Sequence, residues 1–298
     1  MTSRLIKILV ALVILAGLIV LAASWYLSSL VLYPKSVCRK EHYVYCNDPS
    51  EIPVSFENVS FTTSDEIELK GWYMPATGSG KTIVLVHGHG GSKNEGLRFV
   101  KALHDAGFNL LVYDSRVLSG GNKAFASMGY FEKKDVKAAI DWVINKKQAQ
   151  SIGVFGFSMG AATSILAMEE DLRIKAGMFS SSYASVVDEL AEVGKRDFGL
   201  PEFPILPVAI FIANIRGDMD LYSVVPERSI PRISPRPVYI MQCKQDDYVD
   251  YSHAQRLYKA AKDPKSFWGV PCNRHEYLWN SNPEKVETQV VNFFKLHL

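Results

Sequence analysis

The chain of 298 residues has almost no net charge, because 33 lysines and arginines are balanced by 31 aspartates and glutamates. Proteins that bind nucleic acid usually carry a basic patch or stripe that neutralises phosphates. The sequence has neither a basic run nor an interleaving of basic and aromatic residues. This lack argues against nucleic acid as a partner.

Cysteine is also scarce, and none of the four cysteines belongs to a C-x-x-C pair or to a cluster with histidine. That lack argues against the common zinc spacings, and we predict neither a metal nor a cofactor. The cysteines fall as two pairs, Cys38 with Cys46 and Cys243 with Cys272. Two pairs suit disulfides in an oxidising compartment, although buried free thiols would explain the same count.

What the chain does have is one long apolar run near its N-terminus. Residues 8–27 are uncharged and almost wholly apolar, and about 20 such residues cross a bilayer as a helix. Trp25 and Tyr26 stand at the far end, where aromatic side chains favour the membrane interface. A signal peptide cleaved near residues 22–24 is the alternative, but the run is longer than a usual signal sequence. We predict an uncleaved transmembrane anchor in residues 1–30.

Basic residues do not decide the orientation of this anchor. Arg4 and Lys7 precede the run, whereas Lys35, Arg39 and Lys40 follow it, so the positive-inside rule gives no clear answer. The paired cysteines favour an extracytoplasmic domain. We therefore expect a single-pass membrane protein whose folded domain lies outside the cytoplasm.

After the anchor, a polar connector with several prolines (residues 31–52) leads to a domain at residues 53–298. Two alternating stretches, 53–62 and 67–74, predict an antiparallel hairpin. From residue 82 onward, short apolar runs alternate with helical patterns, which predicts a doubly wound, mainly parallel sheet of the α/β class. Strands are expected at residues 82–87, 110–114, 151–157, 176–180, 237–242 and 266–270, and helices at 95–106, 130–145, 159–170, 252–261 and 284–298.

One segment breaks this alternation. No clear strand pattern occurs between residues 180 and 237, where prolines gather, and residues 203–215 are uncharged and strongly apolar. That apolar stretch is too short to be a second membrane span. Long insertions are often functional, so we predict a cap at about residues 183–234. The alternative is a segment that merely completes the core.

The stretch that points to chemistry is Gly156-Phe157-Ser158-Met159-Gly160. A strand pattern leads into it and small, helix-compatible residues follow, so Ser158 falls at the apex of a strand-to-helix turn. A serine there adopts a strained backbone, which requires glycine two residues away on each side. The N-terminus of the following helix would stabilise an oxyanion. Ser158 is the predicted nucleophile.

A serine nucleophile needs a general base, and the base needs an acid that orients it. Among the histidines, only His275 falls in a loop between the last predicted strand and the final helix. It is the predicted base. Asp246 comes soonest after the strand at 237–242 and is preferred as the acid, with Asp247 as the alternative. The order Ser158, Asp246, His275 is the one described for this kind of elbow.

The oxyanion would need two main-chain N–H donors. One is expected from Met159, directly after the nucleophile, and the other from His89 in the glycine-rich loop at residues 87–92 (HGHGGS). A phosphate cradle is the rival interpretation of such a loop. The loop lacks the G-x-x-x-x-G-K-[ST] and G-x-G-x-x-G spacings, which argues against nucleotide binding.

Taken together, these motifs resemble the α/β-hydrolase superfamily from about residue 53 to the C-terminus. The motifs are residues 87–91 (HGHGG), 113–116 (YDSR), 156–160 (GFSMG), Asp246 in a D-x-x-V turn, and His275. The single anchor before the domain further resembles membrane-anchored serine hydrolases with lipase, thioesterase or peptidase-like relatives. The resemblance implies the same roles for the nucleophile, acid, base and oxyanion donors.

These observations predict a membrane-anchored serine hydrolase that cleaves an ester or thioester through an acyl-enzyme. The apolar insertion and the anchor favour a small lipid-like or acylated substrate. Three alternatives stay open: a peptidase or amidase of the same fold, a proton-abstracting or haloperoxidase-type relative, and a binding module without catalysis.

Overall fold

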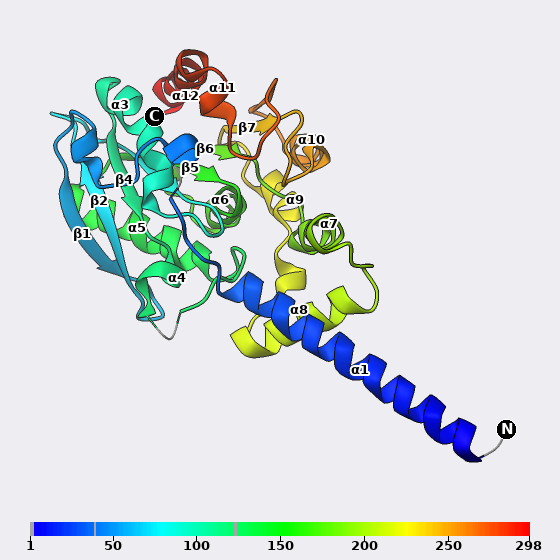
Figure 1. The fold of residues 1–298 in the computed structure, drawn as a ribbon. Helices are drawn as coiled ribbons and strands as arrows, with labels where there is room; N and C mark the ends of the chain where they lie inside the picture. Colours follow the sequence, from blue (N-terminus) through cyan, green and yellow to red (C-terminus); the bar gives the residue numbers. More distant parts are fainter. Residues whose placement is uncertain (1–2, 39, 122–123) are drawn as a thin grey trace.

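The computed structural model describes residues 3–38, 40–121 and 124–298, and Figure 1 shows its two main parts. A twisted sheet with helices on both faces forms the body, and a long N-terminal helix projects away from it. The first two residues of the predicted anchor and Arg39, which we counted among the flanking charges, lie outside the described residues.

The sheet is mixed and mostly parallel, with the strand order β1-β2-β4-β3-β5-β6-β7-β8. Its first two strands form the predicted antiparallel hairpin, and β2 is also antiparallel to β4. All other neighbours are parallel, which confirms the predicted fold class. The strands are β1 (Glu57–Thr62), β2 (Glu68–Met74), β3 (Lys81–Val86), β4 (Asn109–Tyr113), β5 (Ser151–Phe157), β6 (Ile174–Ser180), β7 (Val238–Cys243) and β8 (Lys265–Val270).

The central strands read as nearly continuous apolar runs because helices cover both faces of the sheet. Alternate side chains of β3 show this: Val84 packs with one group of helices, and Leu85 packs with the other. The first group is α5 (Glu132–Lys147), α6 (Met159–Glu170) and α10 (Tyr251–Ala260); the second is α3 (Leu97–Asp105) and α12 (Pro283–His297). The shorter helices are α2 (Lys40–Tyr43), η1 (Pro49–Glu51), η2 (Lys93–Gly96), α4 (Arg116–Ser119) and α11 (Leu278–Ser281).

The N-terminal helix, α1 (Ser3–Leu32), is long and apolar enough to cross a membrane. By length and composition, residues 4–32 are a candidate membrane span, and a signal sequence near the N-terminus would have the same properties. Most of the helix is exposed, but its last turns pack against the body, where Leu32 is fully buried. A disulfide between Cys38 and Cys46 follows directly.

The chain between β6 and β7 contains only helices and loops in the structure, and we call residues 181–237 the insertion. Its helices are α7 (Val186–Phe198), α8 (Ile205–Gly217), η4 (Leu221–Ser223), α9 (Pro226–Ser229) and η5 (Ile230–Arg232). α7 is capped by Ser185, whose side chain accepts from Asp188, and ends at Gly199 in the left-handed region. α8 lies beside the end of α1 (Figure 1), where Ser24 Oγ donates to the Ile205 carbonyl at 3.1 Å.

Candidate active site

Ser158 stands at the junction of β5 and α6, in a backbone conformation that few residues adopt. Its φ is 53° and its ψ is −121°, a strained combination for a residue with a side chain. A Cβ on Gly156 would collide with the Gly160 carbonyl, and a Cβ on Gly160 would collide with the Val86 carbonyl. The two glycines of the motif therefore make the sharp turn sterically possible.

Asp246 and His275 are in contact at the carboxyl ends of β7 and β8. His275 Nδ1 lies 3.0 Å from both carboxylate oxygens of Asp246. Asp246 Oδ1 also accepts the main-chain N–H groups of Tyr248 and Val249, at 2.9 and 3.0 Å. Asp247 has a different task, because its Oδ1 accepts the main-chain N–H of His275 at 2.7 Å. One aspartate orients the ring, and its neighbour holds the loop.

The environment of His275 stabilises its charged form. Burial alone would lower the pKa of His275, but the Asp246 carboxylate, through its charge and its hydrogen bond, raises it to about 9. Asp246 accepts at Nδ1, so Nδ1 carries a proton and Nε2 remains as the nitrogen that can exchange one. Because a general base must be neutral before it acts, proton transfer through His275 depends on pH.

Ser158 and His275 occupy the same edge of the sheet without being bonded. Within the residues that the structure describes, no hydrogen bond joins Ser158 Oγ to His275. Two buried acids lie near both residues. Glu95 lies with Ser158 around Gly88, and Glu189 lines a cavity with Ser158. Burial raises the pKa of each acid, and the charge of His275 opposes that rise in both. Such catalytic hydrogen bonds are often long before substrate binds.

The glycine-rich loop after β3 lies against Ser158. A Cβ on Gly88 would stand 2.9 Å from Ser158 Cβ, so only glycine allows this approach. His89 and Met159 line the same cavity as Ser158. Met159 is the first residue of α6, where main-chain N–H groups lack an acceptor within the helix. The His89 ring contacts α1, because its Nε2 lies 2.8 Å from the Val31 carbonyl and must donate to it.

The cavity at Ser158 has a volume of about 200 Å³, and apolar side chains from three helices form most of its wall. α7 and α8 contribute residues such as Leu190 and Ile210, as expected for an apolar insertion. The last turns of α1 contribute as well, through Leu27, Leu30 and Val31. The sequence did not predict that α1 would border this cavity, because an apolar run carries no sign of which cavity it will line.

Glu189 places a carboxyl group in this apolar wall. Its side chain is 3% exposed, and neither carboxylate oxygen has a hydrogen-bond partner among the described residues. Burial raises the pKa of the Glu189 carboxyl to about 8, although the positive charge of His275 acts in the opposite direction. The group is therefore neutral at pH 7. Nothing in the sequence distinguished it from the other acids of α7.

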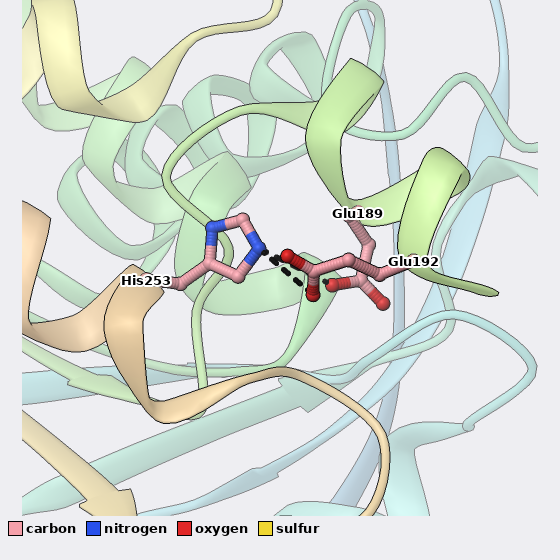
Figure 2. A group of neighbouring side chains, drawn as sticks. All are labelled: Glu189, Glu192 and His253. Carbon is pink, nitrogen blue, oxygen red and sulfur yellow. Dashed lines mark ion pairs between the residues drawn. The ribbon is translucent and has the colours of Figure 1, made fainter. Parts of the chain in front are cut away.

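Glu189 also belongs to a group of three side chains close enough together to hold a metal ion, drawn in Figure 2. His253 reaches from α10 toward α7, and its Nε2 lies 3.4 Å from Glu192 and 3.9 Å from Glu189. However, His253 Nδ1 accepts the Ala184 N–H at 3.0 Å, so the proton of the neutral ring sits on Nε2. A metal needs a lone pair on that nitrogen. The three side chains therefore do not fit a metal site.

Buried charged side chains connect the loop of His89 with the loop of His275. The Arg98 guanidinium pairs with the Glu276 carboxylate at 3.0 Å, and Ser180 Oγ donates to the same carboxylate. Glu95 Oε2 accepts the Gly88 N–H at 2.7 Å, and burial, followed by the charge of Glu276, raises the pKa of Glu95 to about 7. These side chains fix the loops of His89 and His275. The only hint of these side chains in the sequence was that Glu276 directly follows the predicted base, His275.

A disulfide joins the loops of the acid and the base directly. Cys243 ends β7, three residues before Asp246, and is bonded to Cys272, three residues before His275. The cysteines pair as their grouping in the sequence suggested. Because the bridge shortens the chain path between Asp246 and His275, it limits how far the two loops can separate.

Comparisons with known proteins agree with this fold. Residues 81–204 match the family model described as the alpha/beta hydrolase fold. The chain is 28% identical over 229 residues to the uncharacterized protein YqkD of Bacillus subtilis, covering 76% of this chain and 75% of YqkD. It is 25% identical over 251 residues to the uncharacterized protein YfhR of Escherichia coli K12, covering 81% of each.

Among solved structures, the Pyrococcus furiosus esterase Pf2001 superimposes with a TM-score of 0.69 at 25% identity, covering 89% of this chain and 98% of the esterase. The dienelactone hydrolase from Anabaena variabilis, at 16% identity, reaches 0.61 over 82% of this chain and 99% of its own, a likeness in fold alone. The chain has the α/β-hydrolase fold, and these findings support its assignment to the α/β-hydrolase superfamily. Esterases among the neighbours support a hydrolase.

Proposed function

We propose that this protein is a membrane-anchored serine hydrolase that cleaves esters or thioesters of a lipid-like or acylated small molecule. The observation that carries the proposal is the contact between His275 and Asp246 on the sheet edge that also presents Ser158 on its strained turn. The esterases among similar structures support an ester as the bond that is cleaved.

The proposed reaction has two halves. Ser158 Oγ attacks the carbonyl carbon of the ester while His275 Nε2 accepts the serine proton. The carbonyl oxygen becomes an oxyanion, which the main-chain N–H groups of His89 and Met159 stabilise. When the carbon–oxygen double bond re-forms, the alcohol or thiol departs with the proton from His275, and the acyl group stays on Ser158. A water molecule then attacks, His275 accepts its proton and returns it to Ser158, and the carboxylic acid leaves.

The wall of the cavity supports the proposed substrate class. Apolar residues of α1, α7 and α8 form most of the wall around Ser158, and the buried carboxyl of Glu189 is neutral at pH 7, so an acyl chain meets mainly apolar surface there. In this proposal the insertion is a cap over the site, and α1 stays uncleaved as the anchor. The two disulfides favour an extracytoplasmic domain.

Labelling with a fluorophosphonate probe tests the nucleophile. The full-length chain in detergent should form one covalent adduct, at Ser158, and Ser158→Ala should abolish both the adduct and the hydrolysis of p-nitrophenyl butyrate. Ser64→Ala, an exposed serine in the β1–β2 turn, is the matched control and should label normally. An adduct that persists in Ser158→Ala would refute the proposal, and activity that survives the substitution would point to the proton-abstracting alternative.

The same preparation decides between the bonds that could be cleaved. Turnover of p-nitrophenyl esters should exceed turnover of aminoacyl p-nitroanilides, because most of the cavity wall is apolar and gives a charged amino group few partners. Faster cleavage of the anilides would instead identify a peptidase. A protein that neither labels nor turns over either class would be a binding module.

A further inference from the structure

The exposed face of α8 is apolar, the opposite of what a surface helix in water presents. Pro207, Phe211 and Ile215 follow one another at four-residue intervals and therefore lie on one side of the helix, and Phe203 stands just before it. Phe203 is 78% exposed, Phe211 62% and Ile215 66%. We call these four residues the α8 surface. An exposed apolar group of this kind marks a site of contact with something other than water.

The other side of α8 is fixed against the end of α1. Ser24 Oγ donates to the Ile205 carbonyl, and the Arg216 guanidinium donates to Ser28 Oγ at 2.7 Å and to Ser29 Oγ at 2.8 Å. Small residues at such a contact let two helices approach closely. Arg216 is the only charged residue within α8, and its guanidinium also lies 4.3 Å from the ring centre of Trp25. α8 is therefore held in place beside α1.

The length of α1 indicates where this contact lies relative to a membrane. Thirty helical residues extend about 45 Å, whereas the hydrocarbon core takes up about 30 Å, or about 20 residues. If the uncharged residues 8–27 fill that core, Trp25 and Tyr26 lie at its end, where such side chains are favoured. The contact between α8 and α1 begins at Ser24. The α8 surface is thus at the depth where the anchor leaves the bilayer.

The cavity of Ser158 lies behind the same two helices. Leu27 and Leu30 of α1, together with Leu206 and Ile210 of α8, separate it from the outside of the α1–α8 pair. A chain that entered between these helices would come from the region of the bilayer boundary rather than from bulk water. The two helices are thereby connected both to the membrane and to the proposed nucleophile.

We infer that α8 docks into the boundary between headgroups and acyl chains of the leaflet where α1 emerges, and that the cavity takes the acyl chain of an ester held in that leaflet. The occupant is a lipid bilayer because the α8 surface lies beside the end of α1, whose exposed apolar side chains an anchored chain buries in lipid. Both parts of this inference rest on α1 as the membrane anchor of the proposed function; only the substrate part also rests on the proposed catalytic activity.

Fluorescence quenching in vesicles tests the docking without any need for activity. A single thiol-reactive fluorophore is attached to Phe211→Cys in the full chain, reconstituted with brominated lipids under non-reducing conditions that leave the disulfides intact. Strong quenching is expected, comparable with Leu18→Cys in the middle of α1, while Leu172→Cys, an exposed residue between α6 and β6, should stay bright. If Phe211→Cys is as bright as Leu172→Cys, the docking is wrong. Self-quenching that rises with protein density and does not depend on brominated lipid would instead reveal a second copy of the chain on the α8 surface. That result would also overturn the docking.

Turnover tests the substrate part. We expect Phe211→Asp combined with Ile215→Asp to lower hydrolysis of a long-chain monoacylglycerol in vesicles by about tenfold or more, and hydrolysis of aqueous p-nitrophenyl butyrate by less than about twofold. Phe211→Leu and the surface control Leu172→Asp should leave both rates near the wild-type values. Equal losses on the two substrates, or none on either, would overturn the inference. A wild-type chain that cleaves neither ester would refute the proposed function, while the quenching result would still decide the docking.

Discussion

The cavity of Ser158 has two unlike sides. The polar side is built from loops at the carboxyl ends of parallel strands, where hydrogen bonds to the main chain fix each group: Asp246 accepts two N–H groups, and Asp247 accepts that of His275. The apolar side is built from α1 and the insertion, and packing holds it together with a few polar contacts such as that of Ser24. The polar side is suited to chemistry, which needs exact placement of atoms, and the apolar side to an acyl chain, which needs only space and apolar surface.

The largest effect is expected on the polar side. Asp246→Asn should lower kcat on a soluble ester by about 10³-fold to 10⁴-fold, because an amide in this place no longer holds the ring of His275 in the correct tautomer. Asp247→Asn keeps an oxygen that can accept the N–H of His275, so its loss should stay below about tenfold. Steady-state kinetics with p-nitrophenyl butyrate compares the two variants.

The pH dependence of kcat/KM in the same variants distinguishes a loss of the acid from a loss of structure, because misfolding would not shift an apparent pKa. In the wild type, kcat/KM should rise with pH through an apparent pKa of about 9, as His275 loses its proton. Removing the negative charge of Asp246 removes the main stabilisation of the charged ring, so the remaining activity of Asp246→Asn should rise at lower pH. If Asp247→Asn causes the collapse and the shift instead, Asp247 is the acid.

The polar side was the more predictable one, for a geometric reason. Parallel strands end at one edge of a sheet, so a serine after β5, an aspartate after β7 and a histidine after β8 could be assigned to one place from their order alone. The same rule says nothing about side chains behind the loops. Glu95 and Glu276 lie in ordinary helix and loop sequence, and only the fold shows that both are buried next to the catalytic loops.

The apolar side could be predicted only in outline. The apolar character of residues 8–27 and 203–215 was evident from the sequence. However, apolar packing is not specific for one partner, so the sequence could not predict the contact between Ser24 and Ile205, which are 181 residues apart. The interpretation of residues 183–234 as a cap stays a prediction. What the structure adds is that α1 helps to build the cavity wall.

His89 connects the two sides, and a smaller effect is expected there. His89→Leu removes the donor to the Val31 carbonyl and leaves that acceptor unpaired, a loss of about 1–1.5 kcal/mol or roughly tenfold in kcat if it disturbs the oxyanion loop. His89→Gln can still donate and should stay within about threefold of the wild type. KM should change less than kcat, because the oxyanion forms only in the transition state. If both variants have the kcat of the wild type, the contact between His89 and Val31 does not connect the two sides of the cavity.

The smallest effect is expected where the two sides meet, at Glu189. At pH 7 the carboxyl group is neutral, so Glu189→Gln replaces it with a group of similar shape and polarity, and turnover should change by less than about twofold. Above pH 8 the wild-type group ionises and its negative charge favours protonated His275. The variant should therefore be about twofold to threefold faster than the wild type near pH 9, because more of its His275 is neutral.

Thermal unfolding of Glu189→Gln gives a second readout that does not depend on catalysis. The native wild type keeps its proton up to about pH 8, whereas the unfolded chain releases it above the ordinary value of 4.5, so this group lowers stability as pH rises between those limits. The advantage in Tm of Glu189→Gln should grow over that range. Glu192→Gln, one turn away with a side chain that is 41% exposed, is the matched control for replacing a carboxyl group of α7 by an amide. A flat difference in Tm from pH 5 to pH 8 would mean that Glu189 is already charged in the folded protein, and that the wall beside Ser158 is not uniformly apolar.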